Sequence, residues 1–311
     1  MRTFAAILNK IIQYMLPFQP VTIDDKEIIQ SFFNRVDFGN CDFSFSNIFS
    51  WRNTYDTTFA IENDFLYFRF QPPKSLPGYL FPVGEGNLKA AIERLMQDAE
   101  ERATELRLYA ITQRMFDLLE EMIPEKFLYE RDRDWYEYIY SSEDLITLVG
   151  KKYQAKRNHI NKFKRVYEWE YLPITREIIP DCLELYKRWC AENGNCNCEQ
   201  SLIEEGAATQ NAFQHFEKLG LIGGALRING EILAYSYGQP LTKDTFGIHA
   251  EKCLSKIDGG FSMINREFAE HNCTAYTYIN REEDLGKDSL RQAKMSYHPT
   301  ILLEKGYVKL K

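Results

Sequence analysis

The segment from Leu221 to Asn280 constrains the fold of this chain most. It contains three strand patterns, at residues 221–228, 231–238 and 244–251. A helical pattern at 259–271 and a final strand pattern at 275–280 follow. The first two are joined by Asn229-Gly230, the dipeptide most favoured in the tight turn of a β-hairpin. A hairpin that continues into a strand–helix–strand crossover predicts a mixed sheet in an α+β fold.

The same order of elements is predicted for the first half of the chain. Two helical patterns, a hairpin and then alternating strands and helices occupy residues 24–36, 45–55, 58–70, 78–83, 88–103, 105–111, 114–123 and 126–140. The 311 residues are enough for two domains. We therefore predict a first domain at 21–145 and a second at 146–311, preceded by an amphipathic arm at 1–20.

Composition indicates a cytoplasmic protein. The apolar stripe of the arm is interrupted by polar residues, so the arm is too broken for a secretory signal and too short to span a bilayer. No stable membrane insertion is expected. The seven cysteines have no framework spacing, which is typical of a reducing compartment. Their tightest cluster, Cys190, Cys196 and Cys198, has no convincing histidine partner, so no metal site is predicted.

Residues 151–165 form a basic island in a chain whose net charge is −7. They include seven Lys or Arg residues and no acidic residue. Such a run is either a strip that binds phosphate groups or a solvated basic helix between two domains. The candidate substrate-binding residues of this segment are Lys152, Lys156, Arg157, Asn158, His159 and Lys162.

A polar loop follows the strand predicted at 275–280. Loops at the carboxyl ends of central strands are where open sheets bind their ligands. Acyl transfer to an amine requires a base, a charge that stabilises the oxyanion and an acid for the leaving group. The candidate base is Glu283 or Asp284, the candidate stabilising charge is Arg281 or Lys294, and the candidate acid is Tyr297. Asn280 and Arg291 are the candidate substrate-binding residues. The alternative is an acidic cluster at a helix N-terminus, stabilised by the helix dipole.

His249 and Glu251 form a second candidate group. They lie two residues apart on the strand predicted at 244–251, so we expect their side chains on the same face of the sheet. A His–Glu pair near a strand end can act as a base or hold a substrate. A single histidine on a strand is more often structural, so we rank this pair below the polar loop.

Three stretches resemble the C-terminal domain of phosphatidylglycerol lysyltransferases. They are KKYQAKRNHINKFK at 151–164, GGALRINGEILAYSYG at 223–238 and YINREEDLGKDSLRQAKMSYHP at 278–299, and FSFSNIFSWRNTY at 43–55 fits the first half of the same family. The family consists of tandem GNAT-like proteins related to the Fem-type peptidoglycan aminoacyltransferases. The resemblance covers the chain after Pro20 and implies two tandem GNAT-like (acyl-CoA N-acyltransferase-like) domains with mixed β-sheets.

The resemblance also implies an activity. This is aminoacyl transfer of the lysyl type, from aminoacyl-tRNA to an amine or hydroxyl acceptor, either a small molecule or a lipid head group. The basic segment at 151–165 would then hold the tRNA acceptor end. The lipid-modifying relatives have a membrane-spanning domain ahead of the catalytic part. This sequence contains no segment of about 20 apolar residues, which puts the lipid acceptor in question.

Acyl-CoA is the alternative donor. A typical acetyl-CoA-dependent GNAT carries a Gly-rich turn whose backbone N–H groups bind the pyrophosphate. The corresponding stretch here, AEKCLSKIDGGF at 250–261, lacks that pattern but supplies Lys252, Gly259 and Gly260 as candidate cofactor-binding residues. The alternatives are therefore an acyl-CoA-dependent N-acyltransferase and a non-catalytic protein that binds a ligand or RNA.

Overall fold

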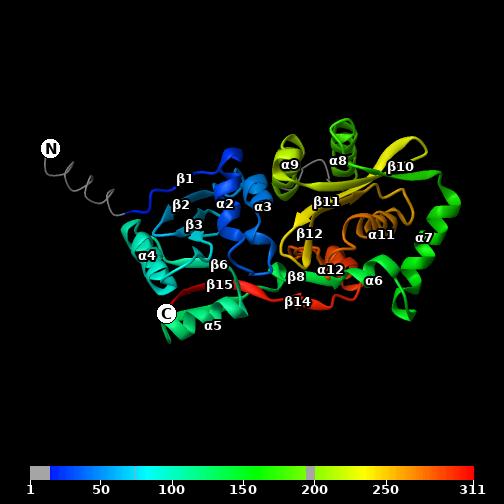
Figure 1. Ribbon diagram of the computed structural model, residues 1–311. Helices are drawn as coiled ribbons and strands as arrows, with labels where there is room; N and C mark the ends of the chain where they lie inside the picture. The colour runs from blue at the N-terminus through cyan, green and yellow to red at the C-terminus, as the bar shows by residue number, and fades with distance from the viewer. Residues whose placement is uncertain (1–14, 74, 194–199) are drawn as a thin grey trace. The chain divides into compact units, whose positions relative to one another are not determined.

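The computed structural model describes residues 15–73, 75–193 and 200–311 (Figure 1). Most of the predicted arm, and Cys196 and Cys198, lie outside the described residues. The chain forms two compact units. The first comprises the residues up to Phe38, Trp51–Trp135 and Glu304–Lys311, and the second comprises Gly39–Ser50 and Tyr136–Leu303. The units are interleaved along the sequence, unlike the contiguous domains predicted at 21–145 and 146–311.

The first unit is built on an eight-stranded mixed sheet. Its strand order is β1-β2-β3-β4-β6-β15-β7, and β5 pairs with β3. The strands are β1 (Gln19–Pro20), β2 (Thr58–Glu62), β3 (Phe65–Phe70), β4 (Gly78–Tyr79), β5 (Val83–Gly84), β6 (Arg107–Thr112), β7 (Phe127–Arg131) and β15 (Lys305–Leu310). The C-terminal strand β15 therefore lies between β6 and β7, antiparallel to both.

Three α-helices in the described part of the first unit pack around this sheet (Figure 1). They are α2 (Lys26–Phe33), α4 (Leu88–Glu101) and α5 (Gln113–Met122). Helix α2 contacts β3 and β5, and α5 contacts β6 and β7. Each helix buries an apolar stripe, for example Ala91, Ile92 and Leu95 of α4, as the helical spacing of these residues predicts.

The second unit contains a seven-stranded sheet with the order β14-β8-β13-β12-β11-β10-β9. The strands are β8 (Glu137–Ser141), β9 (Trp169–Pro173), β10 (Ile222–Ile228), β11 (Glu231–Pro240), β12 (Thr245–Cys253), β13 (Tyr278–Asn280) and β14 (Ile301–Leu303). The predicted hairpin is confirmed, because Ile228 pairs with Glu231 around Asn229-Gly230, both of which have positive φ as a type I′ turn requires.

Helices cover both faces of the second sheet. They are α3 (Phe45–Trp51, whose last residue belongs to the first unit), α6 (Ser142–Thr147), α7 (Gln154–Val166), α8 (Ile179–Asn193), α9 (Gln200–Gln214), α10 (Phe216–Leu219), α11 (Gly260–Asn272) and α12 (Asp288–Met295). Helix α11 contacts β10, β11 and β12 through a fully buried stripe that includes Met263, Ile264 and Phe268. Helices α8 and α9 lie over the other face (Figure 1), where Phe213 of α9 packs edge-on against Tyr235.

A β-bulge interrupts the central pair of strands in the second sheet. Tyr237 of β11 pairs with Ala250 of β12, whereas the next residue, Gly238, pairs with Ile248. His249 is therefore an extra residue with no Cα partner on β11. Bulges of this kind redirect a side chain and are common next to active sites. Gly238 has no room for a side chain, because a Cβ there would lie 1.8 Å from the carbonyl oxygen of Gly247.

The backbone pairing between β12 and β13 ends close to this bulge. These two strands are parallel, and their last paired residues are Gly247 and Asn280. Strand β12 continues to Cys253, whereas β13 ends at Asn280 and leads into residues 281–287. Beyond Asn280, the connection between β12 and the loop depends on side chains rather than on the β-ladder.

We expect opposite effects from adding one methyl group to two glycines of the second unit. Gly238→Ala forces backbone atoms apart and should destabilise the protein by about 1–3 kcal/mol. Gly206→Ala, in the interior of α9, meets the Tyr186 ring at an ordinary 3.5 Å and should stabilise it by about 0.5–1 kcal/mol. Urea unfolding of both variants measures the difference. Equal effects would contradict the tight packing described at the bulge.

Candidate functional site

Residues 281–287 form a loop that is organised by one buried lysine. The Lys294 ammonium donates hydrogen bonds to the carbonyl oxygens of Arg281, Glu282 and Glu283, at 2.5, 3.1 and 2.5 Å. These contacts use all three of its donors, although burial lowers its pKa to about 8. Lys294, predicted as a charge that stabilises an oxyanion, thus lies inside the loop and shapes it. Glu282 has a left-handed backbone with φ 58°, a conformation that functional sites often hold.

Asp284 anchors the far part of this loop. Its fully buried carboxylate accepts hydrogen bonds from Arg291 Nε and Nη2 at 2.8 and 2.9 Å, from the Tyr138 hydroxyl at 2.5 Å and from the backbone N–H of Gly286 at 2.9 Å. Burial alone would raise the pKa of Asp284, but these hydrogen bonds outweigh burial and lower it to about 2. A carboxylate so occupied is a poor base at neutral pH. Its contacts, and those of Arg291, hold the loop in place.

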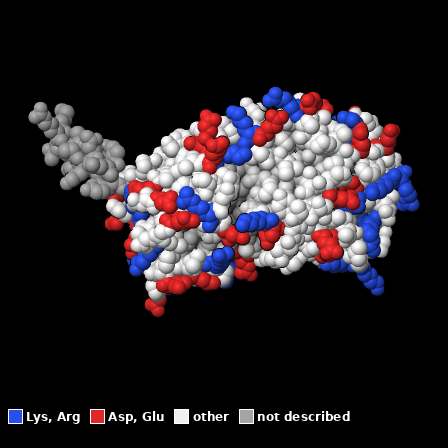
Figure 2. Space-filling model, in the orientation of Figure 1, with Lys and Arg blue, Asp and Glu red and all other residues white. Residues whose placement is uncertain are grey.

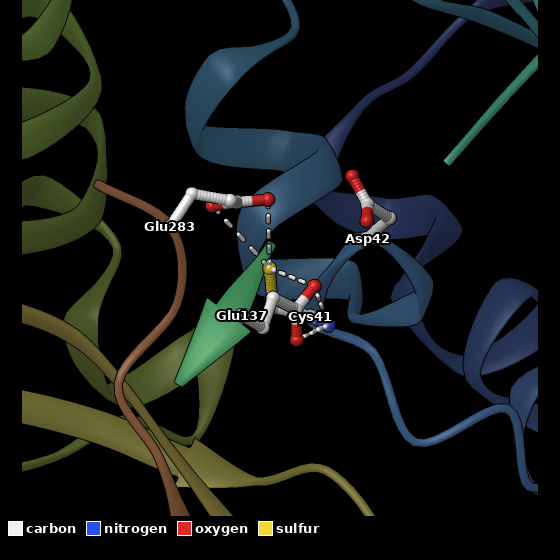
Figure 3. A group of neighbouring side chains, drawn as sticks. All are labelled: Cys41, Asp42, Glu137 and Glu283. Carbon is white, nitrogen blue, oxygen red and sulfur yellow. Dashed lines mark hydrogen bonds between the residues drawn. The ribbon is translucent and has the colours of Figure 1, made fainter. Parts of the chain in front are cut away.

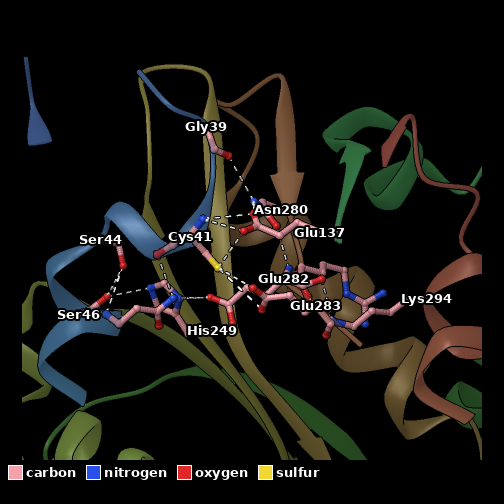
Figure 4. Close-up of polar contacts among 12 residues, drawn as sticks. Gly39, Cys41, Ser44, Ser46, Glu137, His249, Asn280, Glu282, Glu283 and Lys294 are labelled. Atoms are coloured by element: carbon pink, nitrogen blue, oxygen red, sulfur yellow. Dashed lines mark hydrogen bonds and ion pairs between the residues drawn. The ribbon is translucent and has the colours of Figure 1, made fainter. Parts of the chain in front are cut away.

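Two side-chain pairs join β12 to the loop where the backbone pairing has ended. His249 Nδ1 lies 2.7 Å from Glu282 Oε1 (Figure 4), and Arg281 Nη2 lies 3.0 Å from Glu251 Oε1. His249 and Glu251, which were predicted as a pair, therefore each contact a different residue of the loop. Both partners come from the first two residues after β13, so the loop and the strand present their polar groups to each other.

Segment Gly39–Ser50 supplies polar contacts that the sequence analysis did not predict. Ser46 Oγ lies 2.9 Å from His249 Nε2, and Ser44 Oγ lies 3.3 Å from Ser46 Oγ (Figure 4). Asn47 Nδ2 donates to Glu282 Oε1 at 2.9 Å. In the sequence, Ser44, Ser46 and Asn47 lie among aromatic residues in the stretch 43–55, which resembles the first half of the family. Nothing else in the sequence pointed to these contacts.

Arg281 lies in a buried polar cluster under α11. Glu251 accepts from Arg281 and also from Asn265 Nδ2 at 3.0 Å. Within the described part of the chain, Arg281 Nη1 and Asn265 Oδ1 are buried without a hydrogen-bond partner. The Arg281 guanidinium lies 5.0 Å from the ring centroid of Tyr297, and burial raises the pKa of Tyr297 to about 12. Tyr297, the predicted acid, therefore lies beside a cation. Its raised pKa makes it a weak proton donor.

The basic segment at 151–165 folds as a short turn and α7, and its side chains divide into several groups. Lys156 turns inward: its ammonium lies 3.9 Å from the Tyr297 ring centroid, and burial followed by the charge of Arg281 lowers its pKa to about 8. Arg157 donates to the carbonyl oxygens of Leu148 and Gly150. Three more predicted residues lie beside acidic side chains on the surface: Lys152 pairs with Asp144, Lys162 pairs with Asp258, and His159 lies 3.7 Å from Asp258.

One face of α7 stays open to solvent. Asn158, Asn161, Lys164 and Arg165 line a shallow depression of about 480 Å³. Lys and Arg side chains gather over α7 at the right-hand side of Figure 2. Only Asn158 of this set was among the predicted residues. The face presents amide and cationic donors together, a combination suited to phosphate oxygens.

The predicted cofactor-binding residues are packed against neighbouring groups. Lys252 forms an ion pair with Glu205 at 2.6 Å and lies over the Trp189 ring. A Cβ on Gly259 would lie 2.6 Å from the carbonyl oxygen of His159, and one on Gly260 would lie 2.4 Å from Cys253 Sγ. These glycines are required by close packing at the start of α11. The acidic residue Asp258 precedes them, which does not favour a pyrophosphate at this turn.

One group of described residues could hold a metal ion. Ligand atoms of Cys41, Asp42, Glu137 and Glu283 lie within 4.8 Å of one another (Figure 3). The Cys41 thiol donates to Glu137 Oε1 at 3.2 Å and faces Glu283 at 3.8 Å, and Asn280 Nδ2 donates to Glu137. A cation would have to displace the thiol proton. In the structure, hydrogen bonds between its members and from Asn280 hold this group together.

Comparisons with known proteins place this architecture in a family. The chain belongs to the family described as phosphatidylglycerol lysyltransferase, C-terminal, whose model matches residues 33–308. A Bacteroides thetaiotaomicron protein of unknown function is 45% identical, with 96% of this chain and 100% of that chain covered and a TM-score of 0.90. The chain also spans about half the length of a curated relative, an uncharacterised Mycoplasmoides gallisepticum protein that is 26% identical over 187 residues (56% of each chain).

Two further solved structures share the fold. L-PGS from Bacillus licheniformis is 16% identical, with 92% of each chain covered and a TM-score of 0.61. FemX is 10% identical, with 94% of this chain and 97% of that chain covered and a TM-score of 0.60. Together with the two mixed sheets, these likenesses confirm the predicted GNAT-like fold, and the match to the family model confirms the predicted family. In the described part of the chain, no helix is both long enough and apolar enough to cross a bilayer.

Removing the charge of Asp284 should change the acid stability of the protein. The pKa of Asp284 falls from 3.8 to about 2 on folding, so the ionised form contributes about 2 kcal/mol above pH 4. That contribution is lost as the pH falls through about 2. Asp284→Asn should therefore be less stable than the native protein at pH 7, and the difference should narrow by about 1 kcal/mol at pH 3.

Urea unfolding at pH 7, 4 and 3 measures this difference. Asp288→Asn, which removes an exposed carboxylate from the neighbouring α12, is the matched control. A difference between Asp284→Asn and the native protein that is the same at pH 3 as at pH 7 would show that the carboxylate is not held ionised by Arg291 and Tyr138.

Proposed function

We propose that this protein transfers an aminoacyl group from aminoacyl-tRNA to an amine or hydroxyl acceptor. The observation that carries the proposal is the position of His249. It lies at the bulge in β12, hydrogen-bonded to Glu282 at 2.7 Å, at the place where the two parallel strands stop pairing. A histidine that a carboxylate orients is the commonest general base for removing a proton from a hydroxyl or amine.

The neighbouring groups suit the chemistry of an activated ester. When a nucleophile attacks the ester carbonyl, negative charge develops on the carbonyl oxygen and must be stabilised. Among the residues that the structure describes, Arg281 Nη1 is buried without a hydrogen-bond partner, and the guanidinium is fixed by Glu251. In this proposal His249 accepts the proton of the nucleophile and returns it to the leaving ribose oxygen, while Arg281 stabilises the oxyanion.

The family supports an aminoacyl group as the group that is transferred. L-PGS and FemX share the fold of this chain, and the family is described by lysyl transfer to phosphatidylglycerol. A hydroxyl acceptor of the kind that phosphatidylglycerol carries is therefore one candidate, and an amine acceptor is the other. The packed turn at Asp258–Gly260 is a further reason to place the donor on tRNA rather than on coenzyme A.

The open face of α7 is the proposed contact for the tRNA backbone. Lys164 and Arg165 are its cations, and Asn158 and Asn161 add amide donors. Lys164 itself forms an ion pair with Glu267, at the longer distance of 3.7 Å. Other cations of the basic segment have closer contacts: Lys156 with Tyr297, Arg157 with backbone carbonyl oxygens, and Lys162 with Asp258. Phosphate contacts in this proposal therefore concentrate on Lys164 and Arg165 and not on the whole segment.

Binding of charged tRNA should weaken steeply as the salt concentration rises, because phosphate contacts release counterions. The double variant K164E/R165E should bind more weakly and reduce the slope of log affinity against log salt by about 1.4–1.8. The matched control is R176E/K187E, which changes the net charge equally at two exposed residues elsewhere in the unit. Filter binding at several salt concentrations measures both. Equal losses in the two double variants would contradict a contact on α7.

Transfer from aminoacyl-tRNA should depend on His249. With radiolabelled aminoacyl-tRNA and either phosphatidylglycerol vesicles or a soluble amine as acceptor, His249→Gln should lower the rate by about 10²- to 10⁴-fold. His271→Gln, which replaces a histidine stacked on Tyr171 away from this site, should keep the native rate. Transfer from acetyl-CoA but not from aminoacyl-tRNA would instead identify an acyl-CoA-dependent enzyme.

A further inference from the structure

Ser46, His249 and Glu282 form one continuous line of hydrogen bonds. Ser46 Oγ lies 2.9 Å from His249 Nε2, and His249 Nδ1 lies 2.7 Å from Glu282 Oε1 (Figure 4). The three residues come from α3, from the bulge of β12 and from the loop after β13, all within the second unit. A hydroxyl, an imidazole and a carboxylate in this order are the arrangement that activates a serine as a nucleophile.

The partners of Glu282 determine which ring nitrogen of His249 carries the hydrogen. An ionised carboxylate can only accept hydrogen bonds, and Glu282 Oε1 accepts from Asn47 Nδ2 at 2.9 Å. Nδ1 of a neutral His249 must therefore carry the proton that faces Glu282. Its Nε2 then holds the lone pair and accepts the hydrogen bond from the Ser46 hydroxyl. This is the tautomer in which the imidazole can remove the proton of Ser46.

A second hydroxyl stands beside Ser46. Ser44 Oγ accepts a hydrogen bond from the backbone N–H of Asn47 at 3.2 Å and lies 3.3 Å from Ser46 Oγ. Because the single hydroxyl hydrogen of Ser46 points to His249 Nε2, Ser44 is the donor in the contact between the two hydroxyls. A donor at this place can stabilise the oxyanion that forms when Ser46 attacks a carbonyl carbon.

Other contacts anchor this part of α3 independently of Ser46. Asn211 donates to the carbonyl oxygen of Ser50 at 3.0 Å, and the Phe49 ring packs edge-on against His215 at 4.9 Å. Ser46 is 2% exposed. Its neighbours Asn47 and Glu282 are only partly buried, with the Glu282 side chain 17% exposed, so an acyl donor would approach from their side.

We propose that Ser46 is the nucleophile that first accepts the acyl group, so that transfer proceeds through an acyl-serine. This inference deepens the proposed function and rests on it for the identity of the acyl donor. Ser46 Oγ attacks the carbonyl carbon of the aminoacyl ester, and its proton passes to His249 Nε2. The bond between the carbonyl carbon and the ribose oxygen breaks, and the proton on His249 passes to that oxygen, which leaves.

The second half of the reaction reverses these proton movements. The amine or hydroxyl of the acceptor attacks the acyl-serine carbonyl carbon and loses its proton to His249 Nε2. The ester bond to Ser46 breaks, and the proton on His249 returns to Ser46 Oγ. No oxidant, reductant or further co-reactant is needed, and the enzyme returns to its starting state.

A fluorophosphonate–biotin probe tests Ser46 without requiring tRNA. The serine oxygen displaces fluoride from phosphorus, and peptide mass spectrometry locates the adduct. We expect labelling at Ser46 in the full-length native protein, none in Ser46→Ala, and labelling at least about 100-fold slower in His249→Gln. Ser50→Ala, on the same helix, should label like the native protein. The absence of an adduct on Ser46 of the native protein overturns the proposal, and so does equal total labelling of the native protein and of Ser46→Ala. The native result decides even if a variant fails to fold.

Transfer from aminoacyl-tRNA separates this inference from the function on which it rests. Labelling of Ser46 together with loss of transfer in folded Ser46→Ala supports both. Labelling of Ser46 without any transfer by the native protein supports an activated serine and overturns the proposed function. Transfer by Ser46→Ala at the native rate overturns the acyl-serine and leaves the proposed function standing, with direct attack by the acceptor.

Discussion

The ammonium group of Lys294 is the interaction on which the candidate site depends. A buried charge is costly unless it is hydrogen-bonded, and here three consecutive carbonyl oxygens, of residues 281–283, surround it. Directing three successive carbonyls to one point requires an unusual backbone, which the positive φ of Glu282 provides. With the carbonyls turned inward, the side chains of Arg281 and Glu282 are directed toward β12, where they meet Glu251 and His249.

Much of the fold could be predicted because its signals are local. Asn229-Gly230 determines the hairpin, and the apolar stripe of residues 259–271 determines α11. The interleaving of the two units could not be predicted in the same way. Residues 305–310 have the alternating pattern of a strand, but nothing in that pattern shows that it pairs with β6 and β7, about 180–200 residues earlier. The bulge that frees His249 likewise depends on Gly238, a residue of the neighbouring strand.

In the candidate site, residue types were predictable and roles were not. The polar loop and the pair of His249 and Glu251 were predicted as separate candidates, and the folded chain brings them together because β12 and β13 are neighbouring strands. Whether a carboxylate can act as a base depends on its partners: Asp284 is held by Arg291 and Tyr138, which only the folded chain reveals. Ser46 lies 203 residues before His249, and a serine at the start of a short helix carries no signal of such a contact.

The position of β15 has a consequence for how the protein is made. The last strand of the chain completes the first unit by pairing with both β6 and β7. Until residues 305–310 have left the ribosome, β6 and β7 each expose an unpaired edge of the kind that invites association with other chains. The first unit therefore cannot close until the second unit, which precedes β15 in the sequence, has been synthesised. A nascent chain of this kind gains from protection by chaperones during translation.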